Sequence, residues 1–282
     1  MEVAAALRQL GKAERAVISF PGKVADVGRA QDCCGRSALR LGGAGALVPF
    51  HIGVVKAMVE QDVLPRVISG ASAGPVVAAV VATRTKKERA EAISDVYAGD
   101  LMAFGAEENP SFFSKRIKVS DVKKMIAEMI PDLTFLEAFE RSGIHLNISV
   151  APSHPQQRSR LLSAETSPNV FIREAVRASC AVPGIFPAVT LMAKNAAGER
   201  QPYVPSRKWV DGSVTKDMPA NRLARLYGIN HFITSQTNPA VLWALQDPNN
   251  ADRLLSRFFH IYTSASREWL RAVYPYVMEV TR

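Results

Sequence analysis

The chain of 282 residues lacks several features that would assign it to a specialised class of protein. It has three cysteines, two of them adjacent at Cys33 and Cys34, and their spacing fits neither a disulfide framework nor a metal site. No apolar run approaches the ~18 residues that a membrane-spanning helix needs, and charges interrupt residues 1–16 too often for a secretory signal. We therefore expect a soluble, cytoplasmic protein in a reducing compartment.

Signals for nucleic-acid binding are also absent. The 35 Lys and Arg residues outnumber the 26 Asp and Glu residues, which gives a formal net charge of +9. However, the sequence contains no zinc-finger spacing, no aromatic RNA-binding signature and no run of five basic residues. The charge favours anionic partners in general, so we expect no nucleic-acid partner and a surface that tolerates an anionic membrane.

Strand and helix patterns alternate along the chain from Ser37 onward. Short apolar runs are followed by turns of small residues and then by segments with apolar residues at helical spacing. This alternation is typical of parallel strands joined by right-handed crossovers, with helices on the faces of the sheet. We therefore predict an α/β fold, with strands at 37–41, 66–69, 144–151, 208–214 and 231–237 and helices at 49–61, 75–85, 86–97, 120–130, 134–143, 167–180 and 219–228.

Local signals predict where several of these helices begin and end. Ser120 is placed to be an N-cap, and the Ser-Pro pair at 167–168 is typical of a first helical turn. Thr134 begins a capping box, and Gly143 is a typical helix stop.

Residues 68–77 (ISGASAGPVV) contain a Gly-x-Ser-x-Gly pentapeptide centred on Ser72. A nucleophilic serine needs such a tight strand-to-helix turn, because its Oγ must be exposed while the small neighbours leave room for substrate. The N-terminus of the helix that follows favours negative charge at the same point. The alternative is that Ser72 only caps this helix in an ordinary Gly/Ala-rich turn.

An earlier turn, GGAGAL at residues 42–47, is also rich in glycine and precedes a helix. Its backbone N–H groups would stabilise an oxyanion beside Ser72 if the strands 37–41 and 66–69 are neighbours. Such turns also bind phosphates, but no Lys-Ser/Thr pair follows, and Val48 occupies the last glycine position of a dinucleotide fingerprint. We therefore favour the oxyanion hypothesis over a nucleotide site.

Histidine is the usual base for a serine nucleophile, but no histidine has an obvious catalytic setting. Two lie in predicted helical stretches and two at the beginning of predicted strands, so we interpret them as structural. A Ser-His-Asp hydrolase remains an alternative. The five histidines are His51, His145, His154, His231 and His260.

A carboxylate is the other candidate base. Asp211, in KWVDGSV, ends an apolar strand and is followed by Gly212, so its side chain is expected on a turn at the sheet edge. It must be buried to act, because a solvated aspartate is a weak base at neutral pH. The alternative is an ordinary Asp-Gly turn. We do not expect Cys180 to act as a rival nucleophile, because nothing near it in the sequence would activate it.

Five ordered blocks of this sequence resemble the patatin-like acyl hydrolases, and within them the intracellular triacylglycerol lipases. The resemblance covers roughly residues 37–245 and is far more specific than any single motif. The blocks are GAGALVPFHIGVVKAM (43–58), ISGASAG (68–74), EAVRASCAVPGIFPAV (174–189), KWVDGSV (208–214) and NHFITSQTNP (230–239).

The resemblance implies a three-layer fold with a mainly parallel central sheet and helices on both faces. It also implies a serine lipid acyl hydrolase that cleaves esters of acylglycerols or phospholipids through an acyl-serine, with no metal and no cofactor. A lipid ester would be the substrate, and a membrane or lipid-droplet surface the place of action. Ser72 would be the nucleophile of a Ser-Asp dyad, Asp211 its base, and Gly42, Gly43, Ala44 and Gly45 the oxyanion hole.

One residue departs from the family pattern. The glycine loop of the family reads Gly-x-Gly-x-x-Gly, and Val48 replaces its third glycine. Because a β-branched residue does not readily take a positive φ, we expect strain or displacement of the loop, at about 1–3 kcal/mol. The alternative function is therefore a catalytically impaired, lipid-binding or regulatory relative.

The flanking segments complete the predicted organisation: an irregular lead-in at 1–36, a catalytic domain at 37–245 and a C-terminal helical segment at 246–282. The last segment contains an Arg-aromatic pattern that suits an interfacial helix or, alternatively, a helix that packs on the sheet. Residues 102–115 form a lid or an ordinary loop. The side chains expected in the acyl channel or in the core beneath it are Val176, Cys180, Val182, Ile185 and Phe186.

Overall fold

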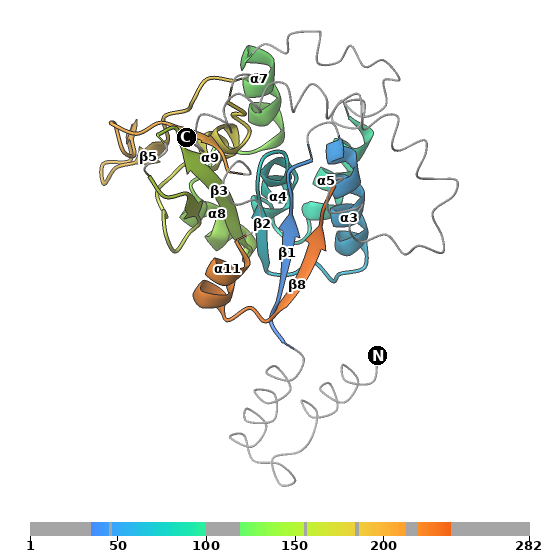
Figure 1. Ribbon diagram of the computed structural model, residues 1–282. Helices are drawn as coiled ribbons and strands as arrows, with labels where there is room; N and C mark the ends of the chain where they lie inside the picture. The colour runs from blue at the N-terminus through green and yellow to red at the C-terminus, as the bar shows by residue number, and fades with distance from the viewer. Residues whose placement is uncertain are drawn as a thin grey trace, which may run out of the picture.

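A mixed, mainly parallel β-sheet forms the centre of the molecule (Figure 1). The computed structural model describes residues 35–44, 47–99, 119–154, 157–183, 186–212 and 219–237, and gives the backbone alone for Asp121. The predicted lead-in up to residue 34, the segment 102–115 and the C-terminal segment 246–282 lie outside these residues.

The order of the strands brings the ends of β1 and β2 together. In this sheet β2 (Val67–Gly70) pairs in parallel with β1 (Ser37–Leu41) and with β3 (His145–Pro152), and β1 also pairs in parallel with β8 (His231–Ser235). Both β4 (Arg160–Leu162) and β7 (Trp209–Asp211) pair antiparallel with β3. The predicted strands 37–41 and 66–69 are therefore neighbours, so the turns that follow them lie at the same edge of the sheet.

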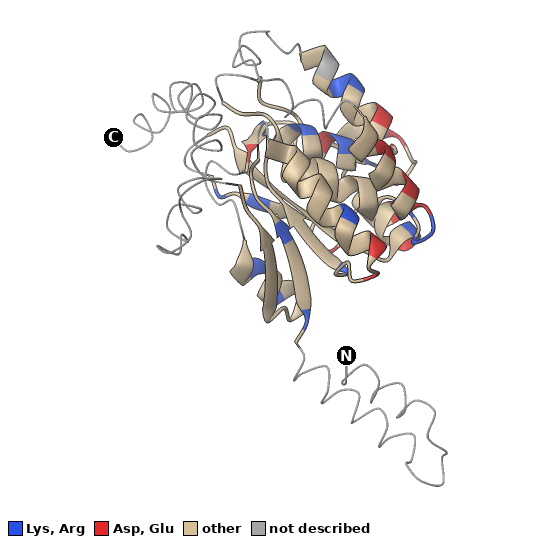
Figure 2. Ribbon diagram, turned by 90° about the vertical axis from the view of Figure 1, so that its right-hand side faces the viewer, with Lys and Arg blue, Asp and Glu red and all other residues tan. Residues whose placement is uncertain are grey.

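Helices cover both faces of the sheet, as Figure 2 shows from the side. The larger core lies between the sheet and most of the helices, and it contains Leu39, Leu41 and Ile68. Their neighbours along the strands, Ala38 and Val67, point to the opposite face and pack against a smaller cluster around α11. The helices are α3 (Val48–Glu60), α4 (Gly74–Ala82), α5 (Arg89–Ala98), α7 (Val119–Met129), α8 (Phe135–Ser142), α9 (Ile172–Ser179) and α11 (Ala220–Tyr227).

The α/β prediction is confirmed, and so are several helix ends. Thr134 accepts from the backbone N–H of Glu137 in a complete capping box, and Gly143 ends α8 in the left-handed conformation. Two predicted boundaries are wrong. Ser120 is not an N-cap, because α7 already includes Val119.

The predicted beginning of α9 at 167–168 is also wrong. The helix begins at Ile172, because the two preceding residues are held in extended pairings. Val170 forms a β-bridge with Ala193, and Phe171 donates its N–H to the carbonyl of Met192. These partners belong to β5 (Met192–Lys194), which forms a short hairpin with β6 (Arg200–Pro202) that the sequence did not reveal.

No helix within the described ranges is both long and apolar enough to cross a membrane.

Candidate active site

Ser72 lies in the turn between β2 and α4 with a backbone φ of +56°. This left-handed conformation is costly for a residue other than glycine, so the surrounding contacts must hold it in place. The turn is pressed against the end of β1: Ala71 donates its N–H to the carbonyl of Leu41 at 3.2 Å. A Cβ on Gly74 would lie 2.5 Å from the same carbonyl oxygen, so only glycine fits there. Gly74, the last residue of the pentapeptide, therefore permits the turn of Ser72 to approach the end of β1 closely.

Ser179, the last residue of α9, holds this turn from the other side. Its buried hydroxyl accepts a hydrogen bond from the backbone N–H of Ser72 at 3.1 Å and donates to the carbonyl of Ser149 at 2.8 Å. The hydroxyl thereby links the strained turn to strand β3. Sequence reasoning assigned no role to Ser179, because the residues that it joins are far apart along the chain.

Asp211 ends β7 opposite Val150 of β3, and only 1% of its surface is exposed. The burial that a carboxylate base requires is therefore present. Gly212 follows as predicted, and a Cβ at this position would lie 2.3 Å from the carbonyl oxygen of Ser149. Only glycine lets the chain turn so close to β3 directly after the carboxylate.

The residues that follow Ser179 connect Ser72 with Asp211. Cys180 donates its thiol to the carbonyl of Ser72 at 3.0 Å, and Ala181 accepts the backbone N–H of Asp211 at 3.0 Å. Burial, and then the negative charge of Asp211, raise the pKa of the Cys180 thiol. The predicted nucleophile and base therefore both contact one short segment, 179–181. The protonated thiol is unsuited to act as a rival nucleophile.

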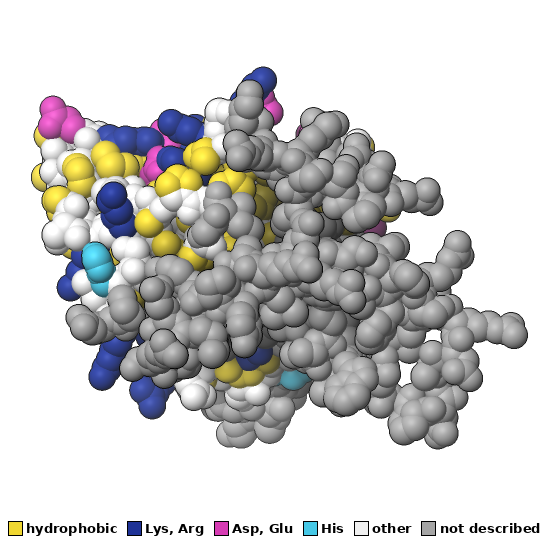
Figure 3. Space-filling view, turned by 45° about the horizontal axis from the view of Figure 1, so that its top comes forward, with side chains coloured by type: hydrophobic (Ala, Val, Ile, Leu, Met, Phe, Trp, Pro, Cys, Tyr) yellow, Lys and Arg dark blue, Asp and Glu magenta, His cyan; other side chains and the backbone are white. Residues whose placement is uncertain are grey.

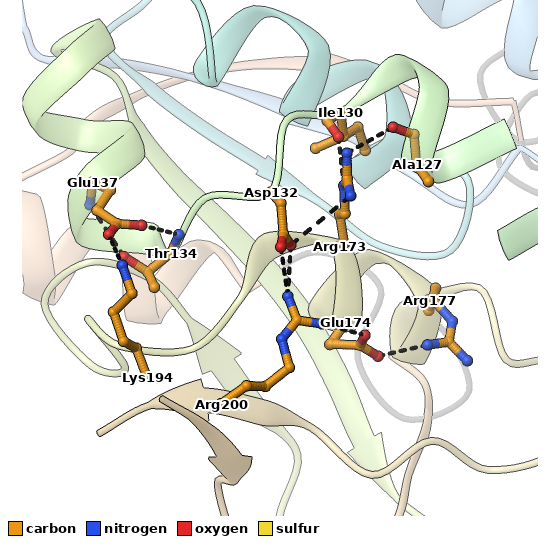
Figure 4. A network of polar contacts seen from close by, with 10 residues as sticks. All are labelled: Ala127, Ile130, Asp132, Thr134, Glu137, Arg173, Glu174, Arg177, Lys194 and Arg200. Atoms are coloured by element: carbon orange, nitrogen blue, oxygen red, sulfur yellow. Dashed lines mark hydrogen bonds and ion pairs between the residues drawn. The ribbon is translucent and has the colours of Figure 1, made fainter. Parts of the chain in front are cut away.

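Charged residues anchor α9, and hence this segment, to its neighbours (Figure 4). Glu174, in the first turn of α9, pairs with Arg177 at 2.7 Å and with Arg200 of β6 at 3.7 Å. Arg200 also binds Asp132 at 2.7 Å, and Arg173 donates to the carbonyl of Ile130 at 2.6 Å. The network ties the first turn of α9 to the hairpin and to the α7–α8 connection.

The glycine-rich turn after β1 is held by α3 and by the end of β8. The imidazole of His51 bonds the carbonyl of Gly42 at 2.9 Å, and Gly42 donates its N–H to the carbonyl of Ser235 at 3.0 Å. Thr237 donates its hydroxyl to the carbonyl of Gly43 at 3.1 Å. The carbonyl of Leu41, the residue before Gly42, accepts the N–H of Ala71, so this loop begins beside the Ser72 turn. The predicted oxyanion role of Gly42 is wrong, because its N–H is already bonded to Ser235. Gly45 lies outside the described residues.

The predicted strain at Val48 is wrong. Val48 is the first residue of α3, is 2% exposed and packs in the larger core. The positive φ values found among non-glycine residues of the described ranges belong to Asp62 and Ser72. The helix begins earlier than the glycine pattern suggests, so a β-branched side chain fits at position 48 without strain.

The described histidines take part in other interactions. His145 pairs with Glu165, His231 bonds the hydroxyl of Ser37 at 2.9 Å, and His154 is exposed. His51 bonds Ser235 and the glycine loop, and His260 lies outside the described residues. A structural role for these histidines agrees with the sequence interpretation, but the position of His51 under the glycine loop could not be read from spacing.

A cavity of about 180 Å³ adjoins the 179–181 segment. On the face of the molecule drawn in Figure 3, hydrophobic side chains of the described residues gather beside Lys and Arg side chains. Two of the predicted channel residues, Cys180 and Phe186, line this cavity, whereas Val176 is buried in the core and Ile185 lies outside the described residues. The other lining residues are Val119, Val122, Lys123, Glu174, Arg177, Ala181, Pro187, Ala188, Val189 and Thr190.

Comparison with known proteins matches this site region to one family. The model of the patatin-like phospholipase family matches residues 39–224, which is more than half of the chain. The chain is 40% identical to triacylglycerol lipase 4 of Saccharomyces cerevisiae over 72% of its length, and 35% identical to triacylglycerol lipase SDP1L of Arabidopsis thaliana over 85%. It is 32% identical to triacylglycerol lipase ptl3 of Schizosaccharomyces pombe over 83%. The chain spans 24%, 32% and 51% of these three relatives.

Proposed function

The chain belongs to the patatin-like phospholipase family, and on this premise we propose that it is a serine lipid acyl hydrolase with Ser72 as nucleophile and Asp211 as general base. Residues 37–245 would form the catalytic domain. The observation that carries the proposal is the segment 179–181, which contacts both the strained turn of Ser72 and the buried strand end of Asp211.

The first half of the reaction forms an acyl-enzyme. Ser72 attacks the ester carbonyl while the carboxylate of Asp211 accepts its proton, and the negative charge moves to the carbonyl oxygen. Backbone N–H groups of Gly43, Ala44 and Gly45 stabilise this oxyanion, whereas the N–H of Gly42 is already bonded to the carbonyl of Ser235. Asp211 then returns the proton to the departing alcohol oxygen as the C–O bond breaks.

The second half regenerates the enzyme. Asp211 accepts a proton from water, whose oxygen attacks the acyl-serine, and the fatty acid leaves as the proton returns to Ser72. Every proton is accounted for by the two side chains and water. No metal and no cofactor take part.

The family and the cavity beside the 179–181 segment support a substrate class. The relatives are named triacylglycerol lipases, and the apolar side chains of Val122, Phe186 and Val189 beside the 179–181 segment suit an acyl chain. We propose carboxylic esters of acylglycerols or phospholipids as substrates, cleaved by a cytoplasmic protein that acts at a membrane or lipid-droplet surface.

The decisive experiment is the reaction of the full chain with a fluorophosphonate, followed by intact-mass measurement and peptide mapping. We expect one adduct, on Ser72, and none in Ser72→Ala. Ester hydrolysis should fall at least about 10³-fold in Ser72→Ala and about 10²- to 10⁴-fold in Asp211→Asn.

Two matched variants control for nonspecific damage. Ser163→Ala removes another buried hydroxyl, and Asp95→Asn changes an exposed aspartate on α5. Both should retain labelling and hydrolysis. A folded wild-type chain that binds liposomes without labelling or turnover would instead support the lipid-binding alternative, and an adduct on another serine would refute the assignment of Ser72.

A further inference from the structure

His51 is fully buried at the beginning of α3 and contacts the glycine loop rather than Ser72 or its turn. Its Nδ1 lies 2.7 Å from the hydroxyl of Ser235 and its Nε2 lies 2.9 Å from the carbonyl oxygen of Gly42. The imidazole therefore bridges the end of β8 and the loop that follows β1. The strands β8 and β1 are neighbours in the sheet and pair in parallel.

The partners determine the tautomer. A carbonyl oxygen can only accept, so Nε2 carries the proton and donates to Gly42, and Nδ1 accepts from the hydroxyl of Ser235. Burial lowers the pKa of His51 below 6.5, although the hydrogen bond to Gly42 opposes this effect. The neutral form that this arrangement requires is therefore favoured at neutral pH.

The planarity of the peptide bond converts this contact into a direction for the loop amides. In a trans peptide the C=O and N–H bonds point to opposite sides. Because the carbonyl of Gly42 points to His51, the N–H of Gly43 points away from it. The carbonyl of Gly43 binds Thr237, so the N–H of Ala44 points away from that side chain in turn.

The loop oriented in this way begins next to the turn of Ser72. The carbonyl of Leu41, the residue before Gly42, accepts the N–H of Ala71, the residue before Ser72. The Gly42–Gly43 peptide begins one residue after this contact between the two loops. A rotation of this peptide would turn the N–H of Gly43. Such a rotation is opposed by the hydrogen bond from His51.

We infer that His51 is a positioning residue, which holds the Gly42 carbonyl inward so that the Gly43 amide faces the ester oxygen during attack by Ser72. This inference rests on the proposed function. His51 would act through the loop and would touch neither substrate nor reacting atoms. Its loss should lower kcat, since the oxyanion is stabilised in the transition state, and leave KM nearly unchanged.

Two amide substitutions distinguish the contribution of Nε2 from that of Nδ1. The amide nitrogen of glutamine reaches the position of Nε2, so His51→Gln retains the donor to Gly42, whereas the shorter His51→Asn reaches only the position of Nδ1. We expect His51→Gln to keep kcat within about 5-fold of wild type, and His51→Asn and His51→Leu to lose about 10- to 100-fold. Ser235→Ala, which removes only the partner of Nδ1, should lose less than His51→Asn.

A readout independent of turnover follows the loop itself. The N–H of Gly42 is bonded to the carbonyl of Ser235, so its hydrogen exchange reports whether the loop is docked. Protection should persist in His51→Gln and decrease in His51→Asn and His51→Leu.

The inference would be overturned if the Gln and Asn variants lost kcat and protection equally and in proportion to their lowered thermal stability. His51 would then have only a packing role. Full activity of folded His51→Asn would also overturn the inference. A wild-type chain without labelling or turnover would refute the proposed function, while the exchange of Gly42 would still decide whether His51 holds the loop.

Discussion

The backbone N–H of Ser72 and the hydroxyl of Ser179 are joined by a hydrogen bond of 3.1 Å, although 107 positions separate the two residues in the chain. The same hydroxyl donates to Ser149 of β3. A single buried side chain therefore satisfies a donor in a left-handed turn and an acceptor in the central sheet. Three elements that carry or border the candidate site, β2, β3 and α9, are fixed relative to one another at this point.

Replacement of Ser179 by alanine should leave the N–H of Ser72 and the carbonyl of Ser149 without this partner. We expect about 1–3 kcal/mol loss in the free energy of unfolding and roughly 10-fold slower fluorophosphonate labelling of Ser72. Chemical denaturation and labelling kinetics measure the two effects. Ser163→Ala, which removes a buried hydroxyl bonded to Thr166, is the matched control and should lower stability without slowing labelling. Equal labelling rates in the two variants would contradict a role for Ser179 at the site.

Restoring the family glycine at position 48 should destabilise the protein. Val48 is buried in the first turn of α3, so Val48→Gly removes core packing and adds backbone freedom to the helix. We expect a loss of roughly 2–4 kcal/mol in the free energy of unfolding and no gain in kcat. A rise in hydrolysis by this variant at unchanged stability would show that the valine does hinder the loop.

Cys180 should resist alkylation in the folded protein. Because burial and the charge of Asp211 raise the pKa of its thiol, the reactive thiolate is scarcer at any given pH than in the unfolded chain. Iodoacetamide at pH 7.5 should modify the Cys180 peptide at least about 10-fold more slowly in native protein than in guanidinium chloride. Equal rates in the two solutions would mean that the thiol is exposed or activated.

Acid should destabilise the fold through His51. Its pKa is lowered in the folded state, so below about pH 6.5 the unfolded chain binds a proton that the folded chain excludes. The stabilisation from the neutral imidazole is present above that pH and is lost as the pH falls toward the lowered pKa. The free energy of unfolding should decrease by up to about 1.4 kcal/mol per pH unit over this window, measured by urea titration.

The variant His51→Gln isolates this contribution. The contacts of the imidazole described above are a hydroxyl and a carbonyl, neither of which titrates in this range. The pH dependence of stability should therefore be flatter in His51→Gln than in wild type. Identical slopes would assign the acid sensitivity to other groups.

The sequence alone determined the local features of this protein. Alternating strand and helix patterns predicted the α/β class, and the Thr134 capping box and the Gly143 stop depend only on neighbouring residues. The Gly-x-Ser-x-Gly turn and the Asp-Gly strand end identified Ser72 and Asp211 as candidates for the same reason.

The tertiary structure decided what depends on distant partners. The helix start at Ile172 is set by pairing with β5, and the conformation of Val48 is set by its place in the core. Neither Ser179 nor His51 stands in a motif that reveals its bonds to Ser72 or to Gly42. Such contacts arise when parallel strand order brings separate chain segments to one edge of a sheet. The spacing of residues along the chain does not reveal that order.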